Sequence, residues 1–384
     1  MNMPEIRFKD FKNEWKHFSF KEITYKAGIK NSENLSLESY SISNELGFIP
    51  QKEQFENGGT MSKADKRMYY IVSSNSFAYN PARINVGSLG YYQGIKDVIV
   101  SSLYEVFKTS DIVDDLFLLY WFKTNIFKRM IEQYQEGGVR LYFFFDKLQK
   151  CQIKIPSLQE QQKISSYFQK LDSLIQTTSK KLTSLKQIKA ASLQSMFPQE
   201  GETVPKVRFK GFEGGWDNNL ISNVCKIITG KSNTQDQVKN GLYPFFIRSE
   251  NIVRSNKYLY DCEAVITIGD GNIGRVFHYI NGKFDLHQRC YMMRNFRNVS
   301  ALYFYYYFSA FFYDRAIKMS AKATVDSVRL NMIADMNILY PKNKLEQQKI
   351  ASYFCNLDKQ ISLQTQRLEK LKQIKAACLD KMFV

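Results

Sequence analysis

The sequence EQQKISSYFQKLDSLIQTTSKKLTSLKQIKAASLQSMF occupies residues 160–197, and EQQKIASYFCNLDKQISLQTQRLEKLKQIKAACLDKMF occupies residues 346–383. The two stretches lie 186 residues apart and are identical at 22 of 38 positions. A second repeat links PEIRFKDF at Pro4, followed by Trp15, to PKVRFKGF at Pro205, followed by Trp216, at an offset of 201 residues. The chain is therefore two copies of one half, with similar frames around dissimilar middles.

Each long repeated stretch is predicted to be a helix. Residues 160–197 contain neither Gly nor Pro, and Pro198 ends the run. Apolar residues recur in steps of three and four, which is the pattern of a coiled-coil seam, and such a helix is about 57 Å long. The predicted seam residues are Ile164, Phe168, Leu171, Ile175, Leu182 and Leu185 in the first copy and Ile350, Phe354, Leu357, Ile361, Leu368 and Leu371 in the second.

One helix with a single apolar stripe needs a partner, and the repeat supplies one. We expect the two helices to pair as an antiparallel coiled coil with a pseudo-two-fold relation between the halves. Two alternatives remain open: each helix docks on its own domain, or the helices pair between two molecules.

The middle of each half is predicted to mix strands and helices. In the first half, strands are expected at 69–72, 84–86 and 97–101 and a helix at 114–132. In the second, strands are expected at 264–268, 275–279 and 290–293 and a helix at 300–319. The expected fold class is α+β, with globular domains at 1–155 and 199–341 and spacer helices at 156–198 and 342–384.

The composition favours a polyanionic partner. Lys and Arg outnumber Asp and Glu by 54 to 37, a formal net charge of +17, and the chain has 24 Tyr and 29 Phe. Such a chain is typical of nucleic-acid binding, and double-stranded DNA is the expected partner. An anionic membrane surface comes second, and a merely basic soluble protein is the other alternative. No CxxC spacing supports a zinc site, and no signal peptide or membrane span is evident, so a cytoplasmic protein without a membrane partner is expected.

Polar loops in the two middles are the candidate DNA contacts. Asn and Arg make bidentate hydrogen bonds to adenine and guanine edges, and small residues let the backbone approach a phosphate. An ordinary loop role is the alternative for each. The candidates are Asn75, Tyr79, Asn80, Arg83, Gly138 and Arg140 in the first half and Arg248, Asn251, His287, Gln288, Arg289, Lys322 and Thr324 in the second.

Motifs of catalysis are incomplete. Gly269-Asp-Gly-Asn-Ile-Gly matches a dinucleotide fingerprint, but a strand rather than a helix is expected after it, so a tight turn is predicted. Asn80-Pro-Ala-Arg lacks the second proline and the aromatic residue of an adenine methyltransferase motif. No Walker A sequence, triad or metal-binding carboxylate cluster is evident, so we assign no catalytic residue, metal or cofactor to this chain.

With two variable regions that are separated and followed by repeated helices, the chain resembles the specificity subunits of type I restriction-modification systems. The resemblance rests on EQQKI, LKQIKAA and the repeated RFxxF…W segment, and it covers essentially the whole chain. Segments 77–87 and 266–290 also look like parts of such target-recognition domains.

The resemblance implies a non-catalytic subunit in which each recognition domain reads one half of a split DNA site. The helices would set the spacer and dock two methyltransferase subunits, and restriction/translocase subunits would join them. S-adenosylmethionine, ATP and Mg²⁺ would belong to those partners, which methylate adenine N6 and cut DNA. A stand-alone DNA-binding regulator and a protein-interaction scaffold are the alternatives.

Overall fold

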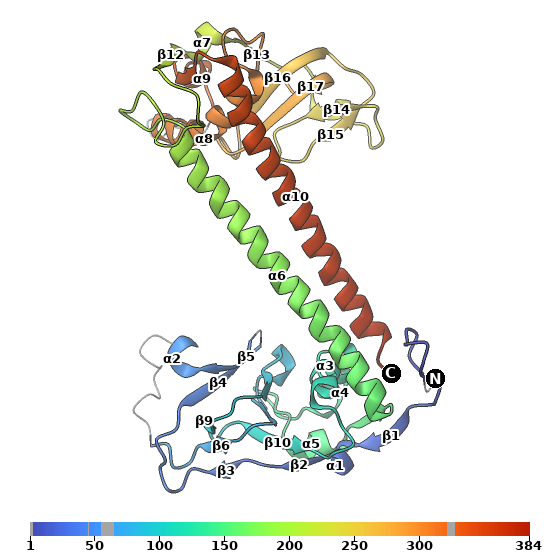
Figure 1. Cartoon of the computed structure of the whole chain (residues 1–384). Coiled ribbons are helices and arrows are strands. Elements are labelled where there is room, and N and C mark those ends of the chain that lie inside the picture. Colours follow the sequence, from blue (N-terminus) through green and yellow to red (C-terminus); the bar gives the residue numbers. More distant parts are fainter. Residues whose placement is uncertain (1–2, 45, 55–64, 321–326) are drawn as a thin grey trace. The chain divides into compact units, whose positions relative to one another are not determined.

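The computed structural model describes residues 3–44, 46–54, 65–320 and 327–384 (Figure 1). Contacts divide the chain into two compact units: unit 1 is Met1–Thr178 with Arg367–Val384, and unit 2 is Ser179–Gln366. Each unit therefore contains one variable middle and parts of both long helices. The domain boundaries expected from the sequence remain a prediction.

Unit 1 holds short strands and helices on the N-terminal side of the first long helix. Its strands are β1 (Lys16–Ser19), β2 (Thr24–Lys26), β3 (Ile29–Lys30), β4 (Ser39–Ser43), β5 (Gly47–Pro50), β6 (Tyr70–Val72), β7 (Ser76–Tyr79), β8 (Leu89–Tyr92), β9 (Val98–Val100), β10 (Glu105–Thr109) and β11 (Gln152–Ile155). Its helices are α1 (Phe20–Ile23), α2 (Gln51–Gln54), the 3-10 helix η2 (Ile84–Val86), α3 (Asp115–Trp121), α4 (Asn125–Tyr134), α5 (Phe145–Lys150) and the first part of α6 (Leu158–Met196).

Unit 2 contains a corresponding series of strands and helices, in which two of the strands are longer and unbroken. Its strands are β12 (Trp216–Leu220), β13 (Lys226–Thr229), β14 (Tyr243–Phe246), β15 (Val253–Ser255), β16 (Tyr260–Ile268), β17 (Phe277–Leu286), β18 (Cys290–Arg294) and β19 (Asn337–Pro341). Its helices are α7 (Ile221–Val224), the 3-10 helix η3 (Thr234–Asp236), α8 (Ala301–Ser320), α9 (Leu330–Ala334) and most of α10 (Lys344–Lys381).

The two units share one sheet topology. In unit 1 the strand order is β2-β10-β7-β8, and in unit 2 the corresponding strands are ordered β13-β18-β16-β17, with neighbours antiparallel in both. A separate two-stranded ribbon flanks each sheet, β1-β11 in unit 1 and β12-β19 in unit 2. The mixed helix and sheet content confirms the α+β class predicted from the sequence.

The long strands of unit 2 are each split in two in unit 1. β16 corresponds to β6 plus β7, and β17 corresponds to β8 plus β9, because β6 pairs with β9 as the outer part of β16 pairs with β17. The first break contains Asn75, whose φ of 59° lies in the left-handed region that asparagine tolerates. The split produces a second sheet, β3-β6-β9-β4-β5, in the described part of unit 1.

Both units contain an antiparallel contact between α6 and α10. In unit 1, the Tyr167 hydroxyl lies 3.5 Å from Cys378 Sγ, and Asp172 Oδ1 lies 2.5 Å from Lys375 Nζ. Residue numbers therefore rise along α6 while they fall along α10, so the two helices run antiparallel. In unit 2, Lys189 contacts Asp358 at 2.5 Å and Ser192 contacts Tyr353 at 2.9 Å, with the same polarity.

The predicted seam is found on the covered side of both helices. Buried seam residues are Ile164, Phe168, Leu171, Leu182, Leu185, Ile350, Phe354 and Leu357, and half-buried ones are Ile175, Ile361, Leu368 and Leu371. The antiparallel coiled coil predicted from the heptads is confirmed by these contacts within each unit.

A pair of buried glutamines explains part of the repeated EQQKI sequence. The Gln161 side chain accepts from the Asp114 backbone N–H at 2.8 Å and donates to the carbonyls of Ile112 and Pro156 at 2.9 and 3.0 Å. In unit 2, Gln347 makes the corresponding bonds to Ser300, Asn298 and Pro341. Each glutamine ties the start of a long helix to the helix of its variable middle, so its identity is a requirement of packing.

Two predicted elements differ from the structure. Residues 84–86 form the 3-10 helix η2 rather than a strand, because Pro81 cannot donate to a sheet and Gly87, at φ 89°, closes the turn. The helix expected at 114–132 is two helices, α3 and α4, because Thr124 caps the second by accepting from the Phe127 N–H at 3.4 Å.

In the other unit α8 runs unbroken over the predicted range, and the Gly269–Gly274 segment is the predicted turn between β16 and β17. Within the described residues, no helix is both long and apolar enough to cross a membrane.

Candidate nucleic-acid interface

Three loops meet at the same edge of the sheet in each unit. In unit 1, the loop 80–83 after β7 and the loop 101–104 before β10 are adjacent because Tyr79 pairs with Glu105. The third loop, 135–144, joins them through the Phe143 N–H, which donates to the Pro81 carbonyl at 3.0 Å. Loops positioned by a rigid sheet are common sites of recognition.

Unit 2 builds the same edge from corresponding loops. The loop after β16 meets the loop 287–289 before β18 because Ile268 pairs with Cys290. The Val328 N–H donates to the Gly269 carbonyl at 2.7 Å, which matches the Phe143–Pro81 bond of unit 1. The scaffold of the edge is thus shared, while its side chains differ.

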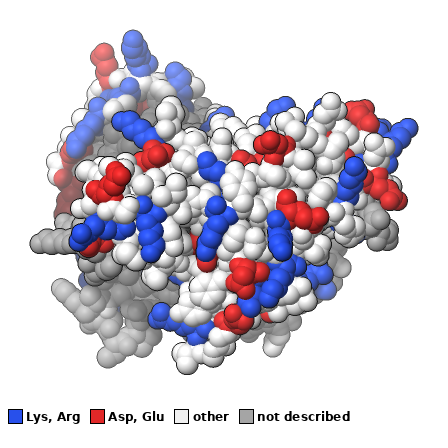
Figure 2. All heavy atoms as spheres, turned by 90° about the horizontal axis from the view of Figure 1, so that it is seen from below, with Lys and Arg blue, Asp and Glu red and all other residues white. Residues whose placement is uncertain are grey.

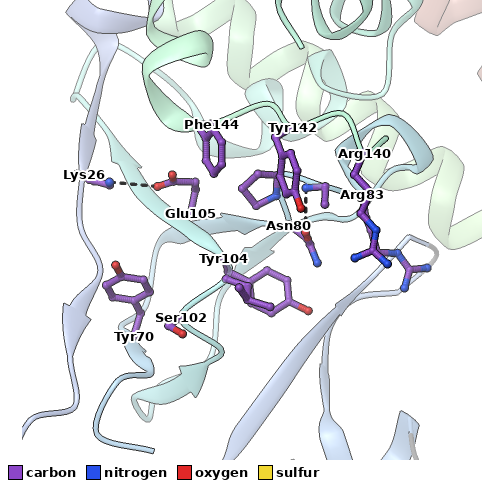
Figure 3. A pocket seen from close by; sticks show the side chains of 13 residues that line it. Lys26, Tyr70, Asn80, Arg83, Ser102, Tyr104, Glu105, Arg140, Tyr142 and Phe144 are labelled. Atoms are coloured by element: carbon purple, nitrogen blue, oxygen red, sulfur yellow. Dashed lines mark hydrogen bonds and ion pairs between the residues drawn. The ribbon is translucent and has the colours of Figure 1, made fainter. Parts of the chain in front are cut away.

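In unit 1 these loops line a cavity of about 820 Å³ (Figure 3). Arg83 and Arg140 lie at one end of the cavity, and the Lys26–Glu105 ion pair, 3.3 Å long, lies at the other. Tyr142 and Phe144 hold their rings parallel within 1° at a centroid distance of 5.4 Å. Aromatic faces beside guanidinium groups suit the stacking and hydrogen bonding of nucleotide bases.

The structure brings three of the predicted unit 1 residues into this cavity. Asn80, Arg83 and Arg140 line it, and Arg83 and Arg140 are exposed. Asn80 also shapes the loop, because its side-chain oxygen accepts from the Ala82 N–H at 3.0 Å. Gly138 is exposed with open space around it. Gly137, at φ 135°, is the glycine that the hairpin requires, because a Cβ at that position would lie 2.1 Å from the Arg140 carbonyl oxygen.

Two other predicted contacts have structural roles. Tyr79 is fully buried against Phe107 and Phe143, so the prediction that its side chain touches DNA needs correction: its aromatic ring belongs to the core. Asn75 is exposed but lies at the break between β6 and β7, and its side-chain oxygen accepts from the Tyr91 hydroxyl at 2.9 Å.

In unit 2 one carboxylate holds two arginines. Arg289 Nη1 donates to Asp270 Oδ2 at 2.9 Å, and Arg248 Nη1 donates to the same oxygen at 3.1 Å. The side chains of Arg248 and Arg289 are 45% and 63% exposed, so their remaining N–H groups can reach a ligand. Asp270 was not among the sequence-predicted residues, and only its place in the predicted turn pointed to it.

The other predicted residues of unit 2 lie around this cluster. His287 is buried, and its Nδ1 accepts from the Arg289 N–H at 3.1 Å, so it supports the loop rather than facing a ligand. Burial lowers the pKa of His287, and Arg248 lowers it further. Gln288 is exposed and donates to the Asn233 side-chain oxygen at 2.6 Å. Asn251 is exposed beyond Arg248, and Lys322 and Thr324 lie outside the described residues.

Charge by itself does not locate an interface on the face seen in Figure 2. There, Lys and Arg side chains are interspersed with Asp and Glu side chains. The excess of 54 basic over 37 acidic residues is therefore not gathered into one unbroken patch on that face. The loops that carry the candidate side chains are defined by the sheet edge instead.

Comparisons with known proteins agree with this architecture. The family model described as the type I restriction modification DNA specificity domain matches residues 13–187 and 213–373, one stretch for each half. The chain is 26% identical over 159 residues to the type I restriction enzyme EcoDI specificity subunit of Escherichia coli. That match covers 41% of this chain and only 35% of the relative's length.

Solved structures share the fold. The type I restriction-modification S subunit from M. genitalium has a TM-score of 0.67 at 14% identity, with 100% of this chain and 99% of that chain covered. A chain from a structure of complex assembly and conformational transition of the type I R-M system has a TM-score of 0.50 at 14% identity, with 96% and 97% covered. Since the family model matches most of the chain, and matches it twice, the protein belongs to the type I restriction-modification DNA specificity family.

Proposed function

We propose that this chain is the DNA-reading subunit of a type I restriction-modification complex, in which each unit reads one half of a bipartite site. The observation that carries the proposal is the shared sheet edge. The same loop scaffold presents Asn80, Arg83 and Arg140 in unit 1. In unit 2 it presents Asp270 and Arg289, which Arg248 joins from the loop after β14. One scaffold with two sets of side chains suits two different base sequences.

The basic composition supports DNA as the ligand. Lys and Arg side chains neutralise phosphates whatever the sequence, while a few Asn and Arg side chains discriminate between bases. The excess of Lys and Arg, which gives the net charge of +17, supplies the attraction to phosphates, and the loop residues supply the discrimination between bases. The chain itself carries out no reaction in this proposal.

The paired helices would act as a ruler and as a docking surface. In this role α6 and α10 set the number of unread base pairs between the half-sites and dock two methyltransferase subunits, which restriction/translocase subunits then join in the cytoplasm. S-adenosylmethionine, ATP and Mg²⁺ serve those partner subunits. Among the described residues there is no group of three or more His, Cys, Asp or Glu that could hold a metal ion.

The experiment is co-expression of the full chain with its methyltransferase subunit, followed by genome-wide mapping of methylated adenine. We expect one bipartite motif with a fixed spacer, which disappears when this chain is omitted. A complex that forms but methylates no defined motif would contradict the proposal and favour a protein scaffold. Sequence-specific binding by the chain alone, without any effect on methylation, would favour a stand-alone regulator.

Paired variants test the assignment of one half-site to each unit. Arg83→Ala with Arg140→Ala should change one half of the motif, and Arg248→Ala with Arg289→Ala should change the other. Arg67→Ala is the matched control, because Arg67 is an exposed arginine of unit 1 that pairs with Asp65 at 2.8 Å and does not line the cavity. Equal loss at both half-sites from either pair would show that the units do not read DNA separately.

A further inference from the structure

The Arg248–Asp270–Arg289 cluster has a charge pattern that distinguishes between ligands. Two guanidinium groups carry two positive charges, and the single carboxylate between them removes one. Asp270 Oδ2 lies 3.1 Å from Arg248 Nη1 and 2.9 Å from Arg289 Nη1, so any group that bridges both arginines comes close to this carboxylate. The carboxylate weakens the attraction of the two arginines for a phosphate oxygen in that place, and it weakens their attraction for a neutral acceptor less.

Guanine offers such an acceptor. Its major-groove edge presents N7 and O6, two neutral acceptors at the spacing of an arginine fork, and this is the commonest specific arginine contact. The carboxylate also fixes the planes of the guanidinium groups, which reduces the side-chain freedom lost on binding.

The backbone around Arg289 is fixed as well. The Gly269 N–H donates to the Arg289 carbonyl at 2.7 Å, and the Arg289 N–H donates to His287 Nδ1 at 3.1 Å. A Cβ on Gly269 would lie 2.5 Å from the Arg289 carbonyl oxygen, so only glycine permits this close approach. The loop that carries Asp270 is thus held by its backbone against the loop that carries Arg289.

Unit 1 lacks this arrangement. Among the described residues, neither Arg83 nor Arg140 forms an ion pair, although both line the cavity at the corresponding edge. Guanidinium groups that have no ion-pair partner keep their full attraction for a phosphate. The carboxylate is therefore a feature of unit 2 that its scaffold does not require.

On these grounds we infer that unit 2 reads a guanine through Arg289 and Arg248, and that Asp270 is the positioning residue that directs them to the base and away from phosphate. This inference rests on the proposed function, and it names the base class that the unit recognises. It assigns to Asp270 a role in specificity that the sequence did not indicate.

The test uses the full chain in complex with its methyltransferase subunit and a duplex library with randomised half-sites. The wild-type complex should enrich a guanine at a position of one half-site. Arg289→Ala and Arg289→Lys should reduce that preference roughly 10- to 100-fold, because lysine keeps the charge but not the fork. The other half-site should not change.

Asp270→Asn should change two binding properties in opposite directions. Preference for the guanine should fall, while affinity for unrelated duplexes should rise and depend more steeply on salt, because a negative charge has been removed beside the DNA. A variant that had merely lost its fold would lose both kinds of binding. Asp65→Asn is the matched control, since it breaks an Arg–Asp pair in unit 1 and should change neither quantity.

A duplex with 7-deazaguanine at the enriched position identifies the contacted atom. The wild-type complex should lose affinity for it, whereas Arg289→Ala should bind both duplexes equally. If Arg289→Ala and Arg248→Ala instead weaken all sequences alike and lower the salt slope by about one each, the arginines contact phosphate and the inference is wrong. If the wild-type complex enriches no sequence, the proposed function itself fails.

Discussion

The guanidinium group of Arg7 and the carboxylate of Glu160 form a bidentate ion pair, with Nε and Nη2 each 2.7 Å from a carboxylate oxygen. Their side chains are only 12% and 2% exposed. Arg208 and Glu346 form the same pair in unit 2 at 2.6 and 2.8 Å. The N-terminal RFxxF segment of each half is thus fastened to the first turn of its long helix.

Removing Arg7 should destabilise unit 1 strongly. Arg7→Ala leaves the Glu160 carboxylate buried without its partner, and breaking a buried pair in this way costs about 3 kcal/mol. The free energy of local unfolding, measured by native-state hydrogen exchange on peptides of unit 1, should fall by that amount. Unit 2 peptides serve as the internal control. The double variant Arg7→Met with Glu160→Met should regain much of the loss, and no recovery would contradict a role for charge burial.

Asp172 links three helices of unit 1. Its carboxylate accepts from the Tyr120 hydroxyl on α3 at 2.9 Å and from Lys375 Nζ on α10 at 2.5 Å. Asp172→Asn should weaken the docking of residues 367–384 by about 1 kcal/mol, because the ion pair is partly exposed. Faster hydrogen exchange in that segment is the measurement.

The repeat supplies a matched control for this variant. Asp358 accepts from Tyr306 and Lys189 in unit 2 at 3.0 and 2.5 Å. Asp358→Asn should therefore loosen residues 179–196 and leave 367–384 unchanged. If both variants affect both segments equally, the linkage between charge and local docking is wrong.

Three buried thiols should resist alkylation. Burial raises the pKa of Cys151, Cys225 and Cys290 to about 12, so at pH 8 almost none of each is the reactive thiolate. Cys355 is exposed. Iodoacetamide at pH 8 followed by peptide mass analysis should label Cys355 first, and it should label the three buried thiols only after denaturation.

These thiols also predict a loss of stability at high pH. Their folded pKa lies above the unfolded value of about 8.5, so the unfolded state releases protons first. The free energy of unfolding should decline as the pH rises from about 8.5 towards 12. Cys225→Ala should make this decline smaller in unit 2, and an unchanged slope would contradict the assignment.

His278 predicts the opposite dependence at low pH. Burial lowers its pKa, and its ring lies against Phe246 with Nε2 3.2 Å from the Ser249 carbonyl oxygen. The unfolded state binds a proton more readily, so the free energy of unfolding should fall as the pH drops below about 6.5. Urea denaturation of unit 2 between pH 7.5 and 5 measures this.

His278→Gln removes the titration and should flatten that dependence. His287, whose pKa burial also lowers, accounts for the part that remains in the variant. A profile identical to that of the wild type would show that neither the burial of His278 nor its neutral form matters to stability.

The frame of the fold could be predicted because its residues repeat. Phe168 and Phe354 are both completely buried, and the heptad spacing that places them on one face is visible in the sequence alone. The antiparallel direction of the two helices could be predicted from the pseudo-two-fold relation expected between the repeated halves. Predictions of individual helices and strands were wrong where a single side chain determines the structure. Thr124 is such a residue, because it lies between α3 and α4 and caps the second of them.

The candidate site was predicted only in part, because loop contacts depend on residues far apart in the chain. Arg248 and Arg289 could be selected by residue type, but their joint attachment to Asp270 depends on three separate loops meeting. Tyr79 was misplaced for a related reason: its neighbours Asn80 and Arg83 face the cavity, while strand alternation and sheet packing turn its ring into the core.

The core of unit 1 is built from two segments that are synthesised at different times. Phe383 lies in the core of unit 1, with its ring centroid 5.2 Å from that of Phe117 and 5.9 Å from that of Phe168. A ribosome makes Phe117 and Phe168 before the whole of Ser179–Gln366 and makes Phe383 after it, so unit 1 cannot close its core until the residues of unit 2 have been synthesised. A nascent chain that has not yet reached Phe383 therefore exposes the apolar surface that Phe383 covers in unit 1.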